Sequence, residues 1–210
     1  ALLRPGDEVL TSEGSFVLYY LFAQIMNVEL VAAPLRDYRY DLDAIADRIS
    51  EKTKLILLAN PNNPTGTMVG SAEVHRFMEK VPDGALVVFD EAYFDYVADD
   101  DFPDSFEYLE EKRPVLILRT FSKAYGLAGF RVGYGIGRGD IVEVLNKVRP
   151  PFNTPSMAQV AALAAFDDRE HVRKSVEENK RELDFLTEEL QSRSFEIVPS
   201  VANFILVDVG

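Results

Sequence analysis

Short apolar runs that alternate with helix-like stretches constrain the fold of this chain more than any other feature of its sequence. Six such runs, each bounded by turn residues, predict strands over Glu8–Thr11, Val28–Ala33, Lys54–Ala59, Ala85–Asp90, Val115–Thr120 and Arg131–Ile136. The stretches between them predict helices near Phe16–Met26, Leu42–Ser50, Ala72–Lys80 and Asp104–Glu110. This alternation is typical of a mostly parallel sheet with helices on both faces, so we expect a three-layer α/β/α fold.

The pattern changes after Asp140, where helical stretches replace the alternation. Helices are predicted over Asp140–Val148 and Ser156–Phe166, with a proline pair between them that a helix interior does not accommodate. A third, highly charged helix is predicted from Arg169 to about Arg193. Its apolar residues recur mostly at spacings of three, four and seven, which predicts one buried stripe made of Val172, Val176, Leu183, Leu186 and Leu190. A strand pair is expected to follow, over Phe195–Val198 and Asn203–Val207.

These changes divide the chain into two predicted parts with a boundary near Asp167. Residues 1–167 are expected to form a large α/β/α domain, and residues 168–210 the start of a smaller α+β domain. The chain begins at Ala1 without an initiator methionine and ends at Gly210, immediately after an apolar run. Neither end has the character of a solvated tail, so we expect a fragment in which both domains are truncated.

Composition argues against several classes of function. The sequence has no cysteine, which excludes disulfides, thiolate nucleophiles and cysteine metal sites. The two histidines, His75 and His171, lie far apart without a second type of ligand at metal-binding spacing, so no metal site is predicted. A net charge of −13 is expected to repel nucleic acids and anionic membranes. No apolar run is long enough to span a bilayer and no signal peptide is recognisable, which favours a cytoplasmic protein.

Three strands of the predicted sheet end in clusters of polar residues. The clusters are Asn60–Gly66, Asp90–Tyr93 and Arg119–Gly126, and a glycine-rich return, Gly129–Gly135, follows the third. Ligands bind at the carboxyl ends of the strands in an open parallel sheet, so all three clusters are expected at the ligand-binding edge. Each cluster alone has an ordinary explanation as a turn, a helix cap or a surface loop. Only their conjunction indicates a site.

Together the clusters supply the groups that pyridoxal phosphate requires of a protein. Lys123 offers an amine for a Schiff base, and Asp90 offers a carboxylate for the pyridine nitrogen. Tyr93 and the Asn63 amide can hydrogen-bond to the phenolic oxygen of the cofactor. Hydroxyls and a cation that can hold the phosphate follow the third strand, and these are Thr120, Ser122 and Arg131.

At these positions the sequence resembles the fold-type-I aminotransferases, most of all the histidinol-phosphate aminotransferases. The resemblance is carried by Asn62–Gly66, by Asp90–Tyr93 and by Thr120–Gly133. In that family the Schiff-base lysine and the phosphate-binding arginine have the same eight-residue separation as Lys123 and Arg131. The likeness extends over essentially the whole chain. It implies that residues 1–167 are the pyridoxal-phosphate-binding large domain without its amino-terminal segment, and that the small domain begins at residue 168.

The resemblance also implies a role for each candidate residue. Lys123 holds the cofactor and moves a proton between the substrate α-carbon and the cofactor, while Asp90 pairs with the pyridinium. Asn63 and Tyr93 contact the ring oxygen. Three residues bind the phosphate: Thr120, Ser122 and Arg131. Phe16 corresponds to the aromatic residue that stacks on the ring, although its segment departs from the proline-containing form usual in the family.

Family features outside this sequence bear on substrates and partners. A phosphate-binding turn and a tyrosine that reaches the partner subunit are expected upstream of Ala1, and an arginine that clamps the substrate carboxylate is expected beyond Gly210. The resemblance therefore implies a homodimer with shared active sites. It leaves the activity of this chain alone open.

The activity implied is transamination between an amino acid such as glutamate and a 2-oxo or phosphorylated partner. Histidinol phosphate and imidazole acetol phosphate, a substrate pair of histidine biosynthesis, are favoured, and aromatic or other amino acids are the alternative. A decarboxylase of phosphorylated amino acids would use the same lysine, aspartate and tyrosine, and would release carbon dioxide. A non-catalytic sensor domain that binds pyridoxal phosphate is also open, but the acidic charge weighs against its usual DNA-binding context.

Overall fold

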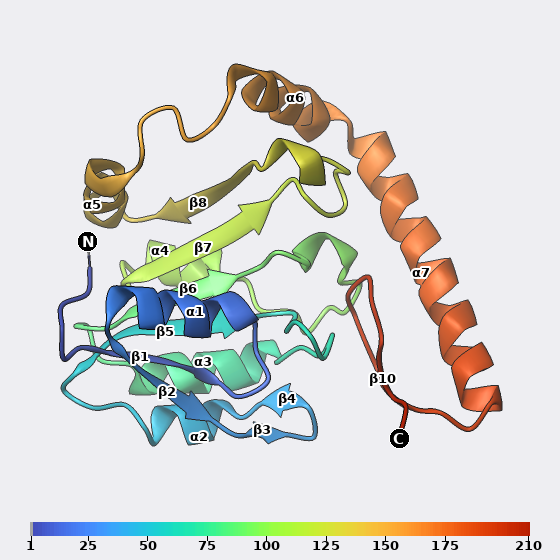
Figure 1. Ribbon diagram of the computed structural model, residues 1–210, viewed down its shortest axis with the longest axis horizontal. Coiled ribbons are helices and arrows are strands. Elements are labelled where there is room, and N and C mark those ends of the chain that lie inside the picture. Colours follow the sequence, from blue (N-terminus) through green and yellow to red (C-terminus); the bar gives the residue numbers. More distant parts are fainter. Residues whose placement is uncertain (1) are drawn as a thin grey trace.

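A six-stranded sheet forms the centre of the molecule, with strand order β2-β1-β5-β6-β7-β8 (Figure 1). The computed structural model describes residues 2–210. The parallel strands are β1 (Glu8–Ser12), β2 (Glu29–Ala33), β5 (Thr53–Ala59), β6 (Leu86–Asp90) and β7 (Val115–Thr120). At one edge β8 (Gly133–Gly137) pairs with β7 in the antiparallel sense. The mostly parallel sheet is confirmed, and each predicted strand of this sheet begins and ends within two residues of the observed one.

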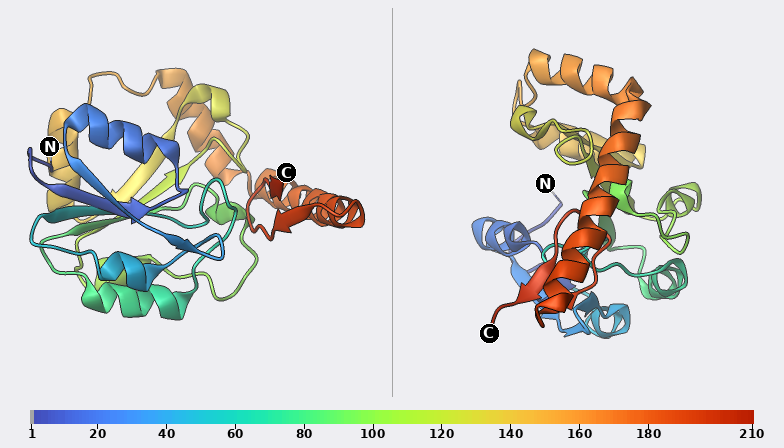
Figure 2. Two further views of the ribbon diagram at one scale, coloured as in Figure 1. Left: turned by 60° about the horizontal axis from the view of Figure 1, so that its bottom comes forward. Right: turned by 90° about the vertical axis from the view of Figure 1, so that its right-hand side faces the viewer.

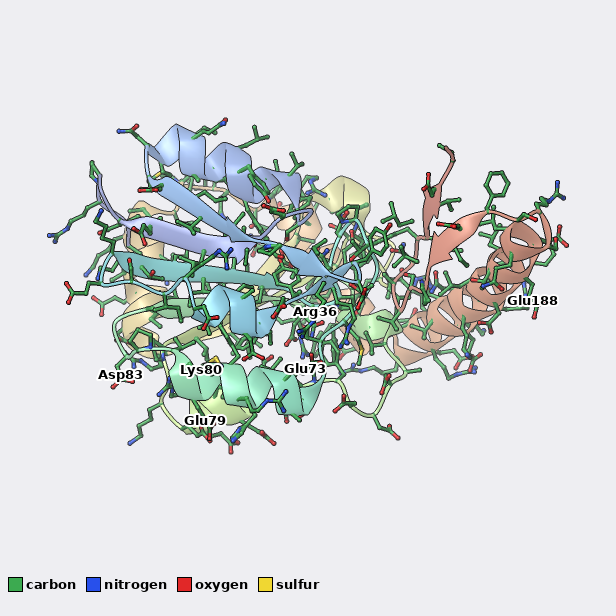
Figure 3. The ribbon with its side chains drawn as sticks, turned by 90° about the horizontal axis from the view of Figure 1, so that it is seen from below. Arg36, Glu73, Glu79, Lys80, Asp83 and Glu188 are labelled. Carbon is green, nitrogen blue, oxygen red and sulfur yellow. The ribbon has the colours of Figure 1, made fainter. Side chains whose placement is uncertain are left out.

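One face of the sheet is covered by three helices, α2 (Leu42–Ala46), α3 (Ser71–Lys80) and α4 (Phe106–Glu110). Strand residues such as Val87 and Phe89 pack there against Val74 and Phe77 of α3 and form the main core. The outer side of α3 carries charged side chains, among them Glu73, Glu79 and Lys80 (Figure 3). Lys80 Nζ lies 2.6 Å from Asp43 Oδ1 of α2, which links the two helices at the surface.

The opposite face is covered by α1 (Val17–Met26) and α5 (Gly139–Val148). Figure 2 shows α1 across the sheet from α2 and α3. Leu86, Val88 and Leu116 pack against Ile141 of α5. Side chains alternate between the two faces along each strand, so Asp90 points to the same side as Leu86 and Val88. The predicted three-layer α/β/α architecture is confirmed.

Two further helices follow the sheet. The first, α6 (Ser156–Asp167), packs Ala162 against Phe121 and Tyr125 of the loop after β7. The second, α7 (Arg169–Ser192), runs along one side of the molecule, past the ends of the strands (Figures 1 and 2). A two-stranded antiparallel sheet, β9 (Glu196–Val198) and β10 (Leu206–Asp208), follows it, and β9 contacts α7. Within residues 2–210, no helix is long and apolar enough to cross a bilayer.

Two predictions about local structure need correction, and one element was not predicted. The helix predicted over Leu42–Ser50 ends at Ala46. After it, the N–H groups of Arg48 and Ile49 each donate to the carbonyl three residues earlier, so the chain forms turns instead of continuing the α-helix. The apolar stripe predicted on α7 is wrong as a buried one, since no side chain of this helix is buried and Leu186 is 47% exposed. Two strands of three residues are too small to cover a helix of 24 residues. A short hairpin of β3 (Leu35–Arg36) and β4 (Arg39–Tyr40) was not predicted.

Candidate active site

A cavity of about 270 Å³ opens at the carboxyl ends of β5, β6 and β7. All eight residues proposed from the sequence line it: Phe16, Asn63, Asp90, Tyr93, Thr120, Ser122, Lys123 and Arg131. They come from the three polar clusters, from the glycine-rich return and from the residue before α1. The parallel order of the strands brings these separate segments to one edge, as expected for a ligand site in an open sheet.

One wall of the cavity is formed by a tyrosine and its partners. Tyr93 is buried, and its hydroxyl accepts a hydrogen bond of 3.0 Å from Asn63 Nδ2. Lys123 Nζ lies 4.8 Å from the centre of the Tyr93 ring. Phe204 packs edge-on against this ring, with 5.1 Å between centroids. Asn63, Tyr93 and Lys123 thus present an amide, a phenol and an amine to the same space.

Asp90 forms a second wall, at the end of β6. Its Oδ2 accepts a hydrogen bond of 2.7 Å from Tyr19 Oη, and its Oδ1 accepts one of 3.3 Å from the Ala92 N–H. Burial raises the pKa of this carboxyl above its ordinary value, while both hydrogen bonds and the positive charge of Lys123 oppose the rise. A cationic ring placed in the cavity would favour the ionised carboxylate in the same way.

The third side of the cavity is suited to an anion. The Ser122 N–H donates to Thr120 Oγ1 over 3.1 Å, which fixes the turn after β7. Arg131 reaches the same corner from a left-handed backbone conformation, with φ of 53°. Its Nη1 lies 3.4 Å from Ser122 Oγ and donates to the Ala128 carbonyl over 2.7 Å. Two hydroxyls and an exposed guanidinium therefore lie together, a donor set typical of phosphate sites.

The turn that carries Lys123 is held from behind. Phe121 and Tyr125, on either side of Lys123, are buried against α6, with 4.9 Å between their ring centroids. The Gly126 N–H donates to the Lys123 carbonyl over 2.9 Å and closes the turn. Gly126 has φ of +73°, a conformation that residues with a Cβ adopt only under strain. The aromatic anchors leave the half-buried Lys123 side chain to project into the cavity.

Sequence reasoning missed Tyr19, which does not line the cavity but holds Asp90 from α1. The sequence signal that could have revealed it is the spacing of Phe16, Tyr19 and Ala23, which places all three on one side of a helix. The rings of Phe16 and Tyr19 meet edge-on with 5.8 Å between centroids. Phe16 itself is half-buried at the cavity mouth.

The groups around the cavity fit pyridoxal phosphate. An amine for its aldehyde, a buried carboxylate for its ring nitrogen, two donors for its ring oxygen and a cationic corner for its phosphate lie in one space. The residues that supply these groups are Lys123, Asp90, Asn63, Tyr93 and, for the phosphate, Thr120, Ser122 and Arg131.

Similar proteins point in the same direction. The chain is 47% identical over 208 residues to the histidinol-phosphate aminotransferase of Moorella thermoacetica, covering 99% of this chain and 54% of that protein. It is 46% identical over 211 residues to the histidinol-phosphate aminotransferase of Akkermansia muciniphila, covering 100% of this chain and 58% of that protein. The chain therefore spans little more than half the length of these curated relatives.

Solved structures agree on the fold. The histidinol-phosphate aminotransferase of Sinorhizobium meliloti, solved in complex with pyridoxal-5′-phosphate, superposes with a TM-score of 0.93 at 31% identity, over 99% of this chain and 57% of that one. An aspartate aminotransferase mutant from Thermus thermophilus superposes at 0.89 with 24% identity over 100% of this chain and 60% of that one, which shows the fold alone. A model of the family described as class I and II aminotransferases matches residues 1–210. This chain belongs to that family.

Proposed function

We propose that the protein carrying this chain is a pyridoxal-phosphate-dependent histidinol-phosphate aminotransferase, and that this chain supplies most of its cofactor site. The observation that carries the proposal is the single cavity lined by all eight candidate residues, with the Lys123 amine beside Tyr93. The names of the Moorella and Akkermansia relatives support the substrate, because the chain shares close to half of its residues with each.

Pyridoxal phosphate, when bound, supplies an aldehyde that bonds to amines and a ring that withdraws electrons from the substrate α-carbon. Lys123 Nζ would hold the cofactor before the substrate arrives, and once free would accept the proton from the substrate α-carbon and deliver it to the cofactor. Asp90 would pair with the ring nitrogen and favour its protonated form, which would strengthen electron withdrawal. The hydrogen-bonded pair of Asn63 and Tyr93 orients the ring through its oxygen.

The remaining candidate residues bind without moving protons. Thr120, Ser122 and Arg131 hold the phosphate through charge-assisted hydrogen bonds. Phe16 would pack on the ring and limit the access of water to it.

The proposed function is tested by the two half-reactions of the whole protein carrying this sequence. Glutamate is expected to bleach the visible band of the bound cofactor, and imidazole acetol phosphate is expected to restore it with formation of histidinol phosphate. Aromatic oxo acids should restore it at least about tenfold more slowly, since a factor of ten needs only ~1.4 kcal/mol of selective binding. Release of carbon dioxide without an oxo acid, or no bleaching at all, would contradict the proposal.

Replacing Tyr19 with phenylalanine is expected to lower turnover about 3- to 10-fold. The hydrogen bond from Tyr19 lowers the pKa of Asp90, so its loss raises that pKa and moves the acid limb of the pH–rate profile to higher pH. Tyr20→Phe is the matched control, because Tyr20 donates its hydroxyl to the Ser12 carbonyl instead. Identical pH–rate profiles for the two variants would show that Tyr19 does not act on Asp90.

We also propose that the protein is a cytoplasmic homodimer, with residues 1–167 as the cofactor-binding domain and residues 168–210 as the start of a second domain. Apolar side chains on the outer side of α1 support an interface there, since Val17 is 60%, Phe22 56% and Ile25 74% exposed. The position of α7 outside the three layers, at one side of the molecule, supports the division into domains (Figure 1).

A further inference from the structure

An ion pair with a buried carboxylate and a partly exposed guanidinium lies behind the candidate active site, on the α4 side of the sheet. Arg119 Nε donates to Glu91 Oε2 over 2.8 Å, and Ser105 Oγ donates to Glu91 Oε1 over 2.6 Å. Glu91 is only 2% exposed. The Arg119 guanidinium also lies over the ring of Phe94, 3.8 Å from its centre. Such a carboxylate is held in place by its hydrogen bonds and its cation, because burial alone disfavours its charge.

The pair joins β6 and β7 where these strands separate. Within residues 2–210, the β6–β7 register runs as far as Asp90 and Leu118, and a 2.9 Å bond from the Glu91 N–H to the Leu118 carbonyl follows. Thr120 is paired with Gly133 of β8. The segments after the two strands then diverge. The one after β6 leads to Tyr93, the one after β7 leads to Lys123, and the cavity opens between them. The ion pair spans the start of this divergence.

The pair does not contact the cavity. Asp90 and Thr120 line the cavity, whereas the neighbouring Glu91 and Arg119 are absent from the lining within residues 2–210. Alternation along the strands explains this, since Arg119 lies on the side of Val115, which belongs to the same core cluster as Tyr108 of α4. Each member of the pair is therefore covalently next to a cavity residue while its side chain is on the other face.

We propose that Arg119 and Glu91 are positioning residues that fix the separation between the Asp90 carboxylate and the Lys123 amine. This inference rests on the proposed function. The pair acts through the backbone: it locks the residue after Asp90 to the residue before Thr120, and so fixes the start of the Lys123 turn. Displacement of reacting groups by ~1 Å can lower a rate about 100-fold. An ion pair that fixes the ends of these two strands relative to each other therefore affects catalysis.

A positioning role and a merely structural one predict different results. A buried ion pair can often be replaced by apolar residues of similar volume without loss of stability. Apolar side chains have no directional bonds, so such a replacement restores the packing but not the fixed separation. A variant that replaces both members of the pair should therefore keep most of its stability but lose turnover.

The experiment compares variants of the whole protein, each loaded with pyridoxal phosphate. They are Arg119→Met, Arg119→Lys, the double variant Glu91→Leu with Arg119→Met, and the control Arg138→Met. Arg138 is paired with the exposed Asp140 at the opposite end of the β7–β8 ladder, so its loss removes the same charge away from the cavity. The readouts are Tm, cofactor affinity, the pH midpoint of the visible cofactor band, kcat and KM.

Arg119→Met is expected to lower Tm, because it leaves Glu91 buried without its cation. The double variant is expected to regain most of that Tm while its kcat stays about 10- to 100-fold below wild type, with KM little changed. Its band midpoint should differ from that of wild type, since the amine and the carboxylate no longer have a fixed separation. Arg138→Met should match wild type in kcat, KM and band midpoint.

Recovery of kcat and of the band midpoint together with Tm in the double variant would overturn the inference. If the double variant does not fold, Arg119→Lys provides the test instead. Lysine keeps the positive charge but lacks the planar guanidinium, with its paired hydrogen-bond donors and its stacking surface. Wild-type values of kcat and of the midpoint in Arg119→Lys would then overturn it. If the wild-type protein forms no band and does not react with glutamate, the proposed function fails, and this inference falls with it.

Discussion

Replacing Lys123 with alanine is expected to abolish the visible absorption band of bound pyridoxal phosphate and to lower turnover by at least about 10⁴-fold. Alanine leaves no amine in the cavity to bond to the cofactor or to accept the α-proton. The cavity residues proposed to bind the ring and the phosphate are untouched, so the cofactor should still bind non-covalently. Spectral titration with pyridoxal phosphate and single-turnover kinetics with glutamate measure the two effects separately.

Two controls make the result specific. Lys123→Arg keeps a cation near the Tyr93 ring but offers no nucleophilic amine, so it should also lack the band. Lys147→Ala removes a lysine paired with Glu143 on the exposed side of α5 and should retain both band and turnover. A band of wild-type intensity in Lys123→Ala would show that another amine holds the cofactor.

Replacing Asp90 with asparagine is expected to have opposite effects on activity and on stability. Turnover should fall roughly 10²- to 10³-fold, because a neutral amide cannot hold the proton on the ring nitrogen by its charge. The protein without cofactor should become more stable at neutral pH, with Tm higher by a few degrees. An asparagine side chain can still bond to Tyr19 and to the Ala92 N–H, so little packing is lost.

The sign of the stability effect follows from the pKa of Asp90. Burial raises this pKa in the folded protein above its ordinary value of 3.8. As pH rises through 3.8, the unfolded chain loses this proton while the folded chain still holds it, so the group lowers the free energy of unfolding. The free energy of unfolding continues to fall until the pH passes the raised pKa of the folded state. Asparagine does not titrate, so the variant does not lose stability in this way.

Thermal unfolding of the wild-type and Asp90→Asn apoproteins across the acidic to neutral range measures this difference. The two Tm values should converge below the ordinary aspartate pKa and separate as pH rises. A variant that is less stable than wild type at neutral pH would show that the carboxylate stabilises the apoprotein. Burial would then not disfavour the ionised form of Asp90 as we infer.

The alternation of short apolar runs and helices was sufficient to predict the sheet and its layers. Buried parallel strands such as β7 carry continuous apolar sequence, so their position is encoded locally. The end of α2 and the exposure of α7 are not local properties. Helix α2 ends where the chain turns toward β5, and the exposure of α7 depends on how little of the described chain packs on it.

The cavity was predictable for residues that carry their own chemistry at strand ends. Lys123, Asp90 and Arg131 are in this group, because the fold places strand ends side by side. Tyr19 and the pair of Glu91 and Arg119 are different. Their importance depends on which side chains they reach across the sheet, and a tyrosine or a charge pair in sequence gives no distance.

The central claim is that Lys123 is the amine that bonds to pyridoxal phosphate. The most direct measurement is to load the whole protein with pyridoxal phosphate, fix the bond by borohydride reduction and map the modified peptide by mass spectrometry. We expect one phosphopyridoxyl group per chain, on Lys123. A stable modification on any other lysine, with Lys123 unmodified, would contradict it.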